Sequence, residues 1–123
     1  MKKRIVISIN PRHVEKIISG IKKYEYRKTA AKQDVSSIII YETSPIKRVI
    51  AEAEILEVLM MSPEKMWIQT QDASGINKQF FDKYFAGRKI AYAYKLGKIK
   101  VYPHPKSLSD YGIKVAPQSF VYV

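Results

Sequence analysis

The 123-residue chain contains no cysteine, and its only histidines are His13 and His104. Without cysteine the protein can form no disulfide, thiolate nucleophile or zinc–cysteine site, which fits a reducing compartment. Neither histidine has a partner at the spacing of metal ligands, so we expect no metal site. The glycine patterns of the Walker loop, the dinucleotide-binding fold and the α/β-hydrolase nucleophile are also missing, and we expect no cofactor.

Long apolar runs are missing as well. None approaches the roughly 20 residues that a membrane-spanning helix needs, and the run after the basic start MKKR is too short for a signal peptide. We therefore expect a cytoplasmic protein with no membrane partner. The length predicts a single domain over residues 1–123 with one modest core, and no repeat or linker divides it. The sequence leaves the oligomeric state open.

Acidic residues are scarce relative to basic ones. The chain has 11 aspartates and glutamates against 22 lysines and arginines, which gives a net charge of +11 at pH 7. The basic residues recur from Lys2 to Lys114, so the charge belongs to the folded body and not to a tail. Such a field attracts polyanions. Nucleic acid is the partner that we expect; a small anionic ligand and a basic surface without a dedicated partner are the alternatives.

The apolar segments alternate with polar residues or are rich in β-branched residues, which predicts strands. In the longest segment, Ala51, Ala53 and Ile55 alternate with Glu52 and Glu54, so a strand is favoured over the competing helix. The two glutamates then share a solvated face, and we do not expect a catalytic dyad. The predicted strands are Lys3–Ile9, Lys22–Lys28, Val35–Thr43, Arg48–Met61, Arg88–Tyr102 with a bend at Gly97, and Gln118–Val123.

Three helical signals lie between these strands. Asn10 as cap, Pro11 at the first position and Gly20 as stop define the first helix, with His13 expected on its exposed side. A second helix starts at Ser62. A third ends at Gly87, and its aromatic face is expected to pack in the core; this face comprises Phe80, Phe81, Tyr84 and Phe85. The order of elements predicts a mixed α+β domain built on a small curled sheet or barrel of five to six strands with short inserted helices.

Charged residues of both signs lie close together in the stretch GIKKYEYRK, directly after the first predicted helix. Alternation along an extended chain places Lys23, Glu25 and Arg27 on one face and Tyr24 and Tyr26 on the other. We expect the two tyrosines to pack in the core. The charged face is either one wall of a binding site or a solvated face, with Glu25 and Arg27 forming an internal ion pair in the second case.

The side chains of this stretch suit a nucleotide. Arg27 can hold a phosphate or carboxylate through two parallel hydrogen bonds, or stack on a base. Lys22 supplies a point charge or, if it is desolvated, a base. Glu25 disfavours a bare phosphate beside it and favours a group that donates hydrogen bonds, such as the amino group of a base.

The segment ISINPRHVEKIISGIKKYEYRK resembles the ASCH family, a branch of the PUA-like superfamily of small β-barrels. Its Gly-x-Lys-x-x-Glu-x-Arg pattern is carried by Gly20, Lys22, Glu25 and Arg27. Softer matches extend the resemblance over nearly the whole chain; they are Ile38–Ile55, Ile90–Gly112 and Pro117–Val123. The resemblance implies a PUA-like barrel, a cleft beside this strand, and RNA binding. It also implies that Lys22 joins the site, which requires a bend at the start of the strand.

A related enzymatic branch removes the acetyl group from N4-acetylcytidine with a lysine and a threonine of the same turn. Lys22 matches that lysine, but Glu25 stands where the threonine would be, which argues against the same covalent mechanism. Lys22 and Glu25 therefore remain candidates for catalysis, in an enzyme that acts on RNA or a modified nucleoside as a ribonuclease or an amidohydrolase-like protein. We expect RNA binding before catalysis. A regulator that binds a small anionic ligand is the second alternative.

The predicted binding residues extend beyond this strand. By resemblance Tyr41, Ser44 and Tyr92 line the cleft. Lys47 and Arg48 either extend a phosphate track or belong to a solvated turn. The full predicted set for RNA or another anionic ligand is Lys22, Lys23, Glu25, Arg27, Tyr41, Ser44, Lys47, Arg48 and Tyr92.

Overall fold

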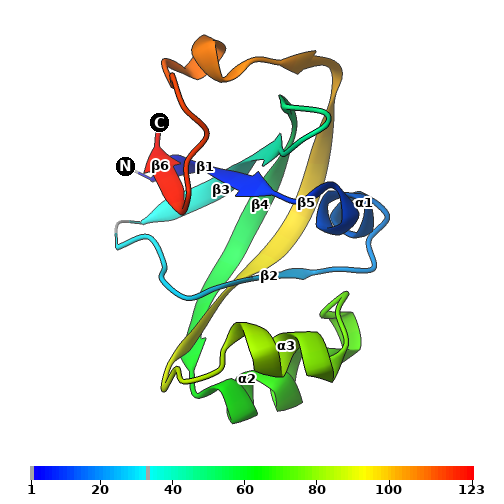
Figure 1. Cartoon of the computed structure of the whole chain (residues 1–123). Coiled ribbons are helices and arrows are strands. Elements are labelled where there is room, and N and C mark those ends of the chain that lie inside the picture. Colours follow the sequence, from blue (N-terminus) through cyan, green and yellow to red (C-terminus); the bar gives the residue numbers. More distant parts are fainter. Residues whose placement is uncertain (1, 33) are drawn as a thin grey trace.

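Six strands form one strongly curled sheet in the order β2-β5-β4-β3-β1-β6 (Figure 1). The computed structural model describes residues 2–32 and 34–123. β1 and β3 are parallel, and every other neighbouring pair of strands is antiparallel. The curled α+β sheet that the sequence predicts is thereby confirmed. The strands are β1 (Lys3–Ile9), β2 (Tyr24–Arg27), β3 (Val35–Glu42), β4 (Arg48–Met61), β5 (Ala91–Lys106) and β6 (Phe120–Tyr122).

β4 and β5 are the longest strands, and their curvature shapes the sheet. Their register shifts where Ala53 pairs with Ile99 but Ile55 pairs with Leu96, so the bend predicted at Gly97 is confirmed. A Cβ atom at Gly97 would collide with the Glu54 carboxylate and with Leu56. Glycine is therefore what allows the two strands to stay paired through the bend.

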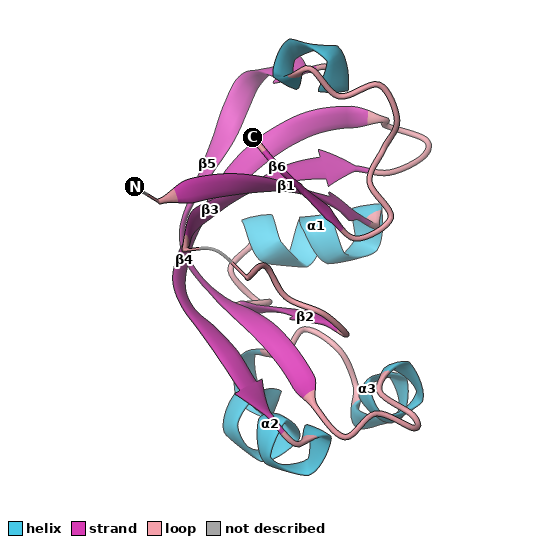
Figure 2. Cartoon of the chain, turned by 90° about the vertical axis from the view of Figure 1, so that its left-hand side faces the viewer, coloured by secondary structure: helices cyan, strands magenta, loops and turns pink. Residues whose placement is uncertain are grey.

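Three α-helices cover the concave side of the curled sheet (Figure 2). α1 (Pro11–Ile18) lies inside the upper curve, and Asn10 caps it by accepting a hydrogen bond from the Arg12 amide. α2 (Pro63–Thr70) and α3 (Lys78–Tyr84) pack at the lower end of β4 and β5. Two short 3₁₀ turns complete the chain, η1 (Gln71–Ala73) and η2 (Leu108–Tyr111). No helix within the described ranges is both long enough and apolar enough to span a membrane.

The core is divided into separate apolar clusters, and the candidate site lies between two of them. The upper cluster packs α1 against the sheet through residues such as Val14, Ile38 and Tyr94. The lower cluster packs α2 and α3 against β2 and β5, with Phe81 and Met66 almost fully buried. β2 and the residues before it run between the two clusters, so side chains that point into this gap meet helices from both.

β2 is shorter than the predicted strand Lys22–Lys28. The backbone bends before Tyr24, because the Lys22 amide donates to the Lys16 carbonyl and the Lys23 amide donates to the Ala73 carbonyl. The bend that the ASCH resemblance required of Lys22 is therefore present. It turns Lys22 away from regular alternation with the residues of β2.

Candidate functional site

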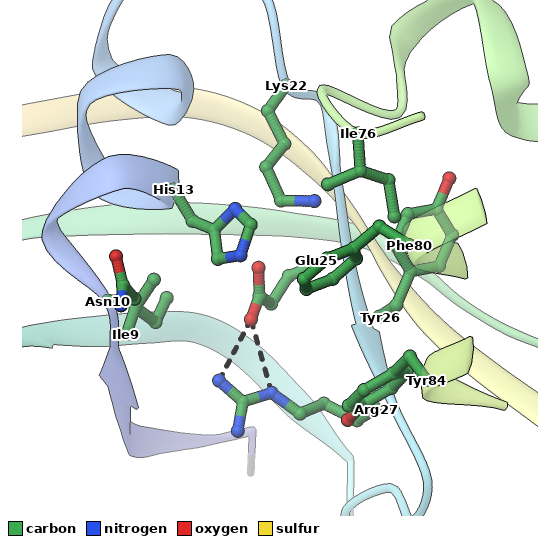
Figure 3. A pocket seen from close by; sticks show the side chains of 10 residues that line it. All are labelled: Ile9, Asn10, His13, Lys22, Glu25, Tyr26, Arg27, Ile76, Phe80 and Tyr84. Atoms are coloured by element: carbon green, nitrogen blue, oxygen red, sulfur yellow. Dashed lines mark hydrogen bonds and ion pairs between the residues drawn. The ribbon is translucent and has the colours of Figure 1, made fainter. Parts of the chain in front are cut away.

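A pocket of about 200 Å³ opens in the gap between α1, β2 and α3 (Figure 3). Its polar side chains come from α1 and from the Lys-x-x-Glu-x-Arg stretch. Its apolar wall comes from the end of β1, from the loop before α3 and from α3 itself. The lining residues are Ile9, Asn10, His13, Lys22, Glu25, Tyr26, Arg27, Ile76, Phe80 and Tyr84.

Glu25 and Arg27 form an ion pair at one side of the pocket, in which two arginine nitrogens share one carboxylate oxygen. Glu25 Oε2 accepts hydrogen bonds from Arg27 Nε at 3.2 Å and from Arg27 Nη2 at 2.8 Å. Arg27 Nη2 also donates to the Ser8 carbonyl at 3.0 Å, which ties β2 to β1. Among the described residues Glu25 Oε1 has no hydrogen-bond partner, and it points toward His13 and Lys22 (Figure 3). The internal ion pair therefore exists and still leaves the other carboxylate oxygen of Glu25 for a ligand.

Lys22 is the most deeply buried cation of the pocket, with 3% of its surface exposed. Its ammonium donates to the Ser74 carbonyl at 2.8 Å and lies 4.8 Å from the centre of the Tyr26 ring. Burial lowers the pKa of Lys22 to about 8, and the nearby Glu25 carboxylate offsets part of that effect. The side chain can therefore act as a hydrogen-bond donor at neutral pH and lose its proton slightly above it.

The loop before α3 holds Lys22 in place. Gly75 has a φ of +70°, and a Cβ atom there would lie 2.6 Å from Lys22 Cβ. The Gly75 carbonyl accepts a hydrogen bond from Lys16 Nζ at 2.8 Å. Ser74 is buried, and its hydroxyl bonds to the Gln71 and Ile76 carbonyls. This loop is more than 50 positions away in sequence, and no local pattern around Lys22 indicates it.

His13 lines the pocket, so its predicted place on the exposed side of the first helix is wrong. The helix lies inside the curl of the sheet, and the side of it that carries His13 faces the pocket instead of solvent. His13 packs edge-on against Phe80 with ring centres 5.6 Å apart, and its Nδ1 is buried without a hydrogen-bond partner among the described residues. Burial, and then the charge of Lys22, lower its pKa. The imidazole is therefore neutral at pH 7, and its Nδ1 is available for a hydrogen bond to a ligand.

Side chains from both faces of β2 line the pocket, whereas alternation predicts that only one face does. Tyr26 packs in the core as expected: its ring meets Phe81 edge-on at 5.2 Å, and its hydroxyl shares a 2.6 Å hydrogen bond with Thr70. The same ring also forms part of the pocket floor beside Lys22. Tyr24 is half-buried. The pocket opens at the end of this short strand, where side chains of both faces reach it.

The aromatic face predicted for the third helix is only partly core. Phe81 and Phe85 are buried, whereas Phe80 is 48% exposed and Tyr84 is half-buried. The latter two line the pocket because α3 presents its remaining side to β2 and α1. Spacing along a helix shows which residues share a face. It does not show where the covered part of that face ends.

The remaining predicted binding residues do not line this pocket. Tyr41 is buried in a third apolar cluster with Val6 and Ile113. Tyr92 pairs with Arg27 across the β2–β5 ladder but does not reach the pocket. An exposed turn between β3 and β4 carries Ser44 and Lys47, exposed Arg48 begins β4, and Lys23 lies at a second cavity. The structure thus brings together Lys22, Glu25 and Arg27 of the predicted set.

Some lining residues carried no functional signal in the sequence. Asn10 showed only as a helix cap, and Ile76 as the start of an amphipathic segment. No three histidine, aspartate or glutamate side chains gather into a metal-binding group within the part of the chain that the structure describes. The chemistry available to this pocket is therefore that of an ammonium group, a carboxylate, a guanidinium group and a neutral imidazole.

The buried ammonium of Lys22 predicts a specific pH dependence of stability. Its pKa falls from 10.5 to about 8 on folding, so between these values the unfolded chain binds more protons than the folded chain. The free energy of unfolding should rise with pH across this window, by roughly 3 kcal/mol in total. Urea unfolding of the wild type and of Lys22→Met, from below pH 8 up to pH 10.5, isolates this contribution. A stability difference that stays constant or moves against the wild type as pH rises contradicts the burial of a charged lysine.

Comparison with known proteins agrees with this architecture. The curled six-stranded sheet with its helices is a PUA-like fold. The model of the ASCH domain family matches residues 7–103, and the chain belongs to this family. The crystal structure of ASCH from Zymomonas mobilis is similar with a TM-score of 0.89 and 27% identity, covering 98% of this chain and 87% of that chain. A variant of that protein with one tyrosine replaced matches at 0.89 and 26% identity, over 99% and 91% of the two chains.

Curated relatives are similar along the sequence. An ASCH domain-containing ribonuclease from Z. mobilis is 30% identical over 96 residues, which are 77% of this chain and 65% of that protein. Two larger proteins of Ureaplasma parvum contain a similar segment. The chain spans 39% of the large ribosomal subunit protein uL22, with 29% identity over 97% of this chain. It spans 15% of the ATP synthase subunit alpha, with 28% identity over 99% of this chain.

Proposed function

We propose that this ASCH protein binds single-stranded RNA and that the pocket receives one of its nucleotides. The observation that carries the proposal is the unpaired Oε1 of the buried residue Glu25 beside the Lys22 ammonium, in a pocket with an aromatic wall. The edge of an unpaired base presents an N–H donor next to a ring nitrogen or carbonyl acceptor. Glu25 suits the donor, and Lys22 suits the acceptor.

The shape of the pocket supports a base in preference to a bare anion. A buried carboxylate repels a phosphate placed directly against it. Phe80, Tyr84 and Ile76 offer apolar surface to a planar ring, and exposed aromatic side chains are common stacking partners for unpaired bases. The net charge of +11 attracts the backbone of the strand that carries the base. A relative from Z. mobilis is named a ribonuclease, which supports RNA as the class of ligand.

We expect labelled single-stranded RNA to bind with an affinity that falls steeply with salt concentration. The reason is release of counterions from the phosphates, which gives a slope of about −0.7 per neutralised phosphate on a plot of log affinity against log salt. Fluorescence anisotropy over a salt series measures this slope. A duplex RNA of the same sequence serves as control and should bind more weakly, because its base edges are already paired. If a panel of RNAs shows no binding at low salt, the proposal is wrong.

A second candidate function is chemistry on RNA or a modified nucleoside. It is favoured by one observation: a lysine whose pKa is lowered to about 8 lies in the same pocket as a carboxylate. A neutral Lys22 can accept a proton from an attacking hydroxyl, and a buried Glu25 can orient the reacting group. RNA and N4-acetylcytidine incubated with the wild type and with Glu25→Ala separate binding from turnover. Product from the wild type alone supports an enzyme, and no product from the wild type excludes this candidate.

A further inference from the structure

A second cavity adjoins the candidate pocket along the side chain of Lys22. Its volume is about 350 Å³, and Lys22 lines both cavities. Its polar rim is formed by Lys23 and Lys95, which are both exposed. Its floor is apolar, with Ile17 and Leu96 buried beneath. The two cavities therefore lie on either side of Lys22, which is their shared wall.

The backbone fixes the two lysines of the second cavity close to each other. The Lys23 carbonyl accepts a hydrogen bond from the Leu96 amide at 2.9 Å, which joins this residue to β5. Lys95 pairs directly with Tyr24 in the β2–β5 ladder. The half-buried ring of Tyr24 lies in the same cavity. Two cations and one aromatic ring thus come from adjacent, hydrogen-bonded strands and not from mobile tails.

Charged residues of both signs line the first cavity, whereas the charged residues that line the second are all basic. Glu25 lines the first cavity, whereas no carboxylate is among the residues that line the second; the Glu54 carboxylate, which lies beside Gly97 at its edge, accepts a hydrogen bond from the Lys98 amide. Glu57 is opposite Lys95 in the β4–β5 register, and within the described residues no ion pair joins them. A lysine ammonium is a point charge that suits a phosphate oxygen. The first cavity suits a base, and the second suits the negatively charged backbone.

We infer that the second cavity binds the phosphate and the nucleoside that follow the nucleotide in the pocket, with Lys23 and Lys95 holding the phosphodiester and Tyr24 contacting the nucleoside. This inference rests on the proposed function. It makes the site one for two successive nucleotides, the first in the pocket beside α3 and the second in the cavity beside β5. It also gives Lys23 a role separate from that of Glu25 and Arg27, with which simple alternation groups it.

The double variant Lys23→Gln/Lys95→Gln tests the inference. For a short single-stranded RNA, its salt slope should be smaller than that of the wild type by about 0.7, since the one phosphodiester that the two lysines hold is no longer neutralised. Its affinity for a nucleoside 5′-monophosphate, measured by calorimetry, should stay within about twofold, because the pocket of Glu25 is intact. The control Lys100→Gln/Lys114→Gln removes the same charge from two exposed lysines outside both cavities and should leave the slope nearly unchanged.

The outcomes separate the inference from the proposed function. If the test variant keeps the wild-type slope while Lys22→Met loses RNA affinity, the second cavity is not a subsite and the pocket still binds RNA. If the control variant loses as much slope as the test variant, the general charge of the protein explains the effect, and the inference is overturned. If the wild type binds no RNA, both the proposed function and the inference are wrong.

Discussion

Lys22→Met is expected to lower the affinity for single-stranded RNA by roughly 10- to 100-fold. The substitution keeps the length and most of the volume of the side chain and removes the ammonium group. Hydrogen bonds to charged groups contribute about 1.5–3 kcal/mol, and Lys22 is the buried donor next to the free oxygen of Glu25. The loss should appear in fluorescence anisotropy at low salt, where the wild type binds most tightly.

Lys114→Met provides the matched control for this experiment. Lys114 is exposed, lies in the loop before β6, and carries the same charge. Its removal should change RNA affinity by no more than about twofold, because screening weakens an exposed charge far from the ligand. Equal losses from both variants would mean that only the overall charge binds RNA. An unchanged affinity in Lys22→Met would remove Lys22 from the site.

Gly75→Ala is expected to damage the site from outside the pocket. The new Cβ atom would lie 2.6 Å from Lys22 Cβ and 2.9 Å from Lys22 Cγ, at a residue whose φ is +70°. The left-handed conformation costs alanine about 1–2 kcal/mol, and overpacking costs about 1–3 kcal/mol. The side chain of Lys22 must shift, so RNA affinity should fall at least about tenfold together with a lower unfolding midpoint.

Gly87→Ala separates these two contributions. Gly87 has a φ of +77°, and no atom lies within 4 Å of the Cβ position there. This variant should lose only the stability that backbone strain costs and should bind RNA like the wild type. Urea unfolding and RNA titration of both variants test the account. A Gly75→Ala protein that binds RNA as tightly as Gly87→Ala would show that the Ser74–Gly75 loop does not position Lys22.

Local sequence signals were sufficient for the elements that position the site. Asn10, Pro11 and Gly20 mark the ends of the first helix because capping and left-handed stops depend on a few neighbouring atoms. The Gly-x-Lys-x-x-Glu-x-Arg pattern located Lys22, Glu25 and Arg27, which the structure brings to one pocket. Between Ala51 and Ile55 the burial pattern of β4 follows the alternation of its apolar residues, and the strand was predicted with the observed bounds.

The rest of the pocket depends on tertiary packing. His13 and Phe80 meet because α1 and α3 approach each other across β2, and neither helix carries a signal for the other. The contact between Lys22 and Gly75 joins segments more than 50 positions apart, and its requirement for glycine is visible only in three dimensions. Resemblance alone suggested Tyr41 as a lining residue, and the curl of the sheet instead buries it in another apolar cluster.

The pocket between α1, β2 and α3 is the RNA-binding site that we propose. A crystal structure of the protein with a short single-stranded RNA tests this most directly. We expect one base inside the pocket, with an N–H group within hydrogen-bond distance of Glu25 Oε1 and an acceptor within reach of Lys22 Nζ. The next phosphate should lie beside Lys23 and Lys95. An RNA strand bound on another face, with this pocket empty, would contradict it.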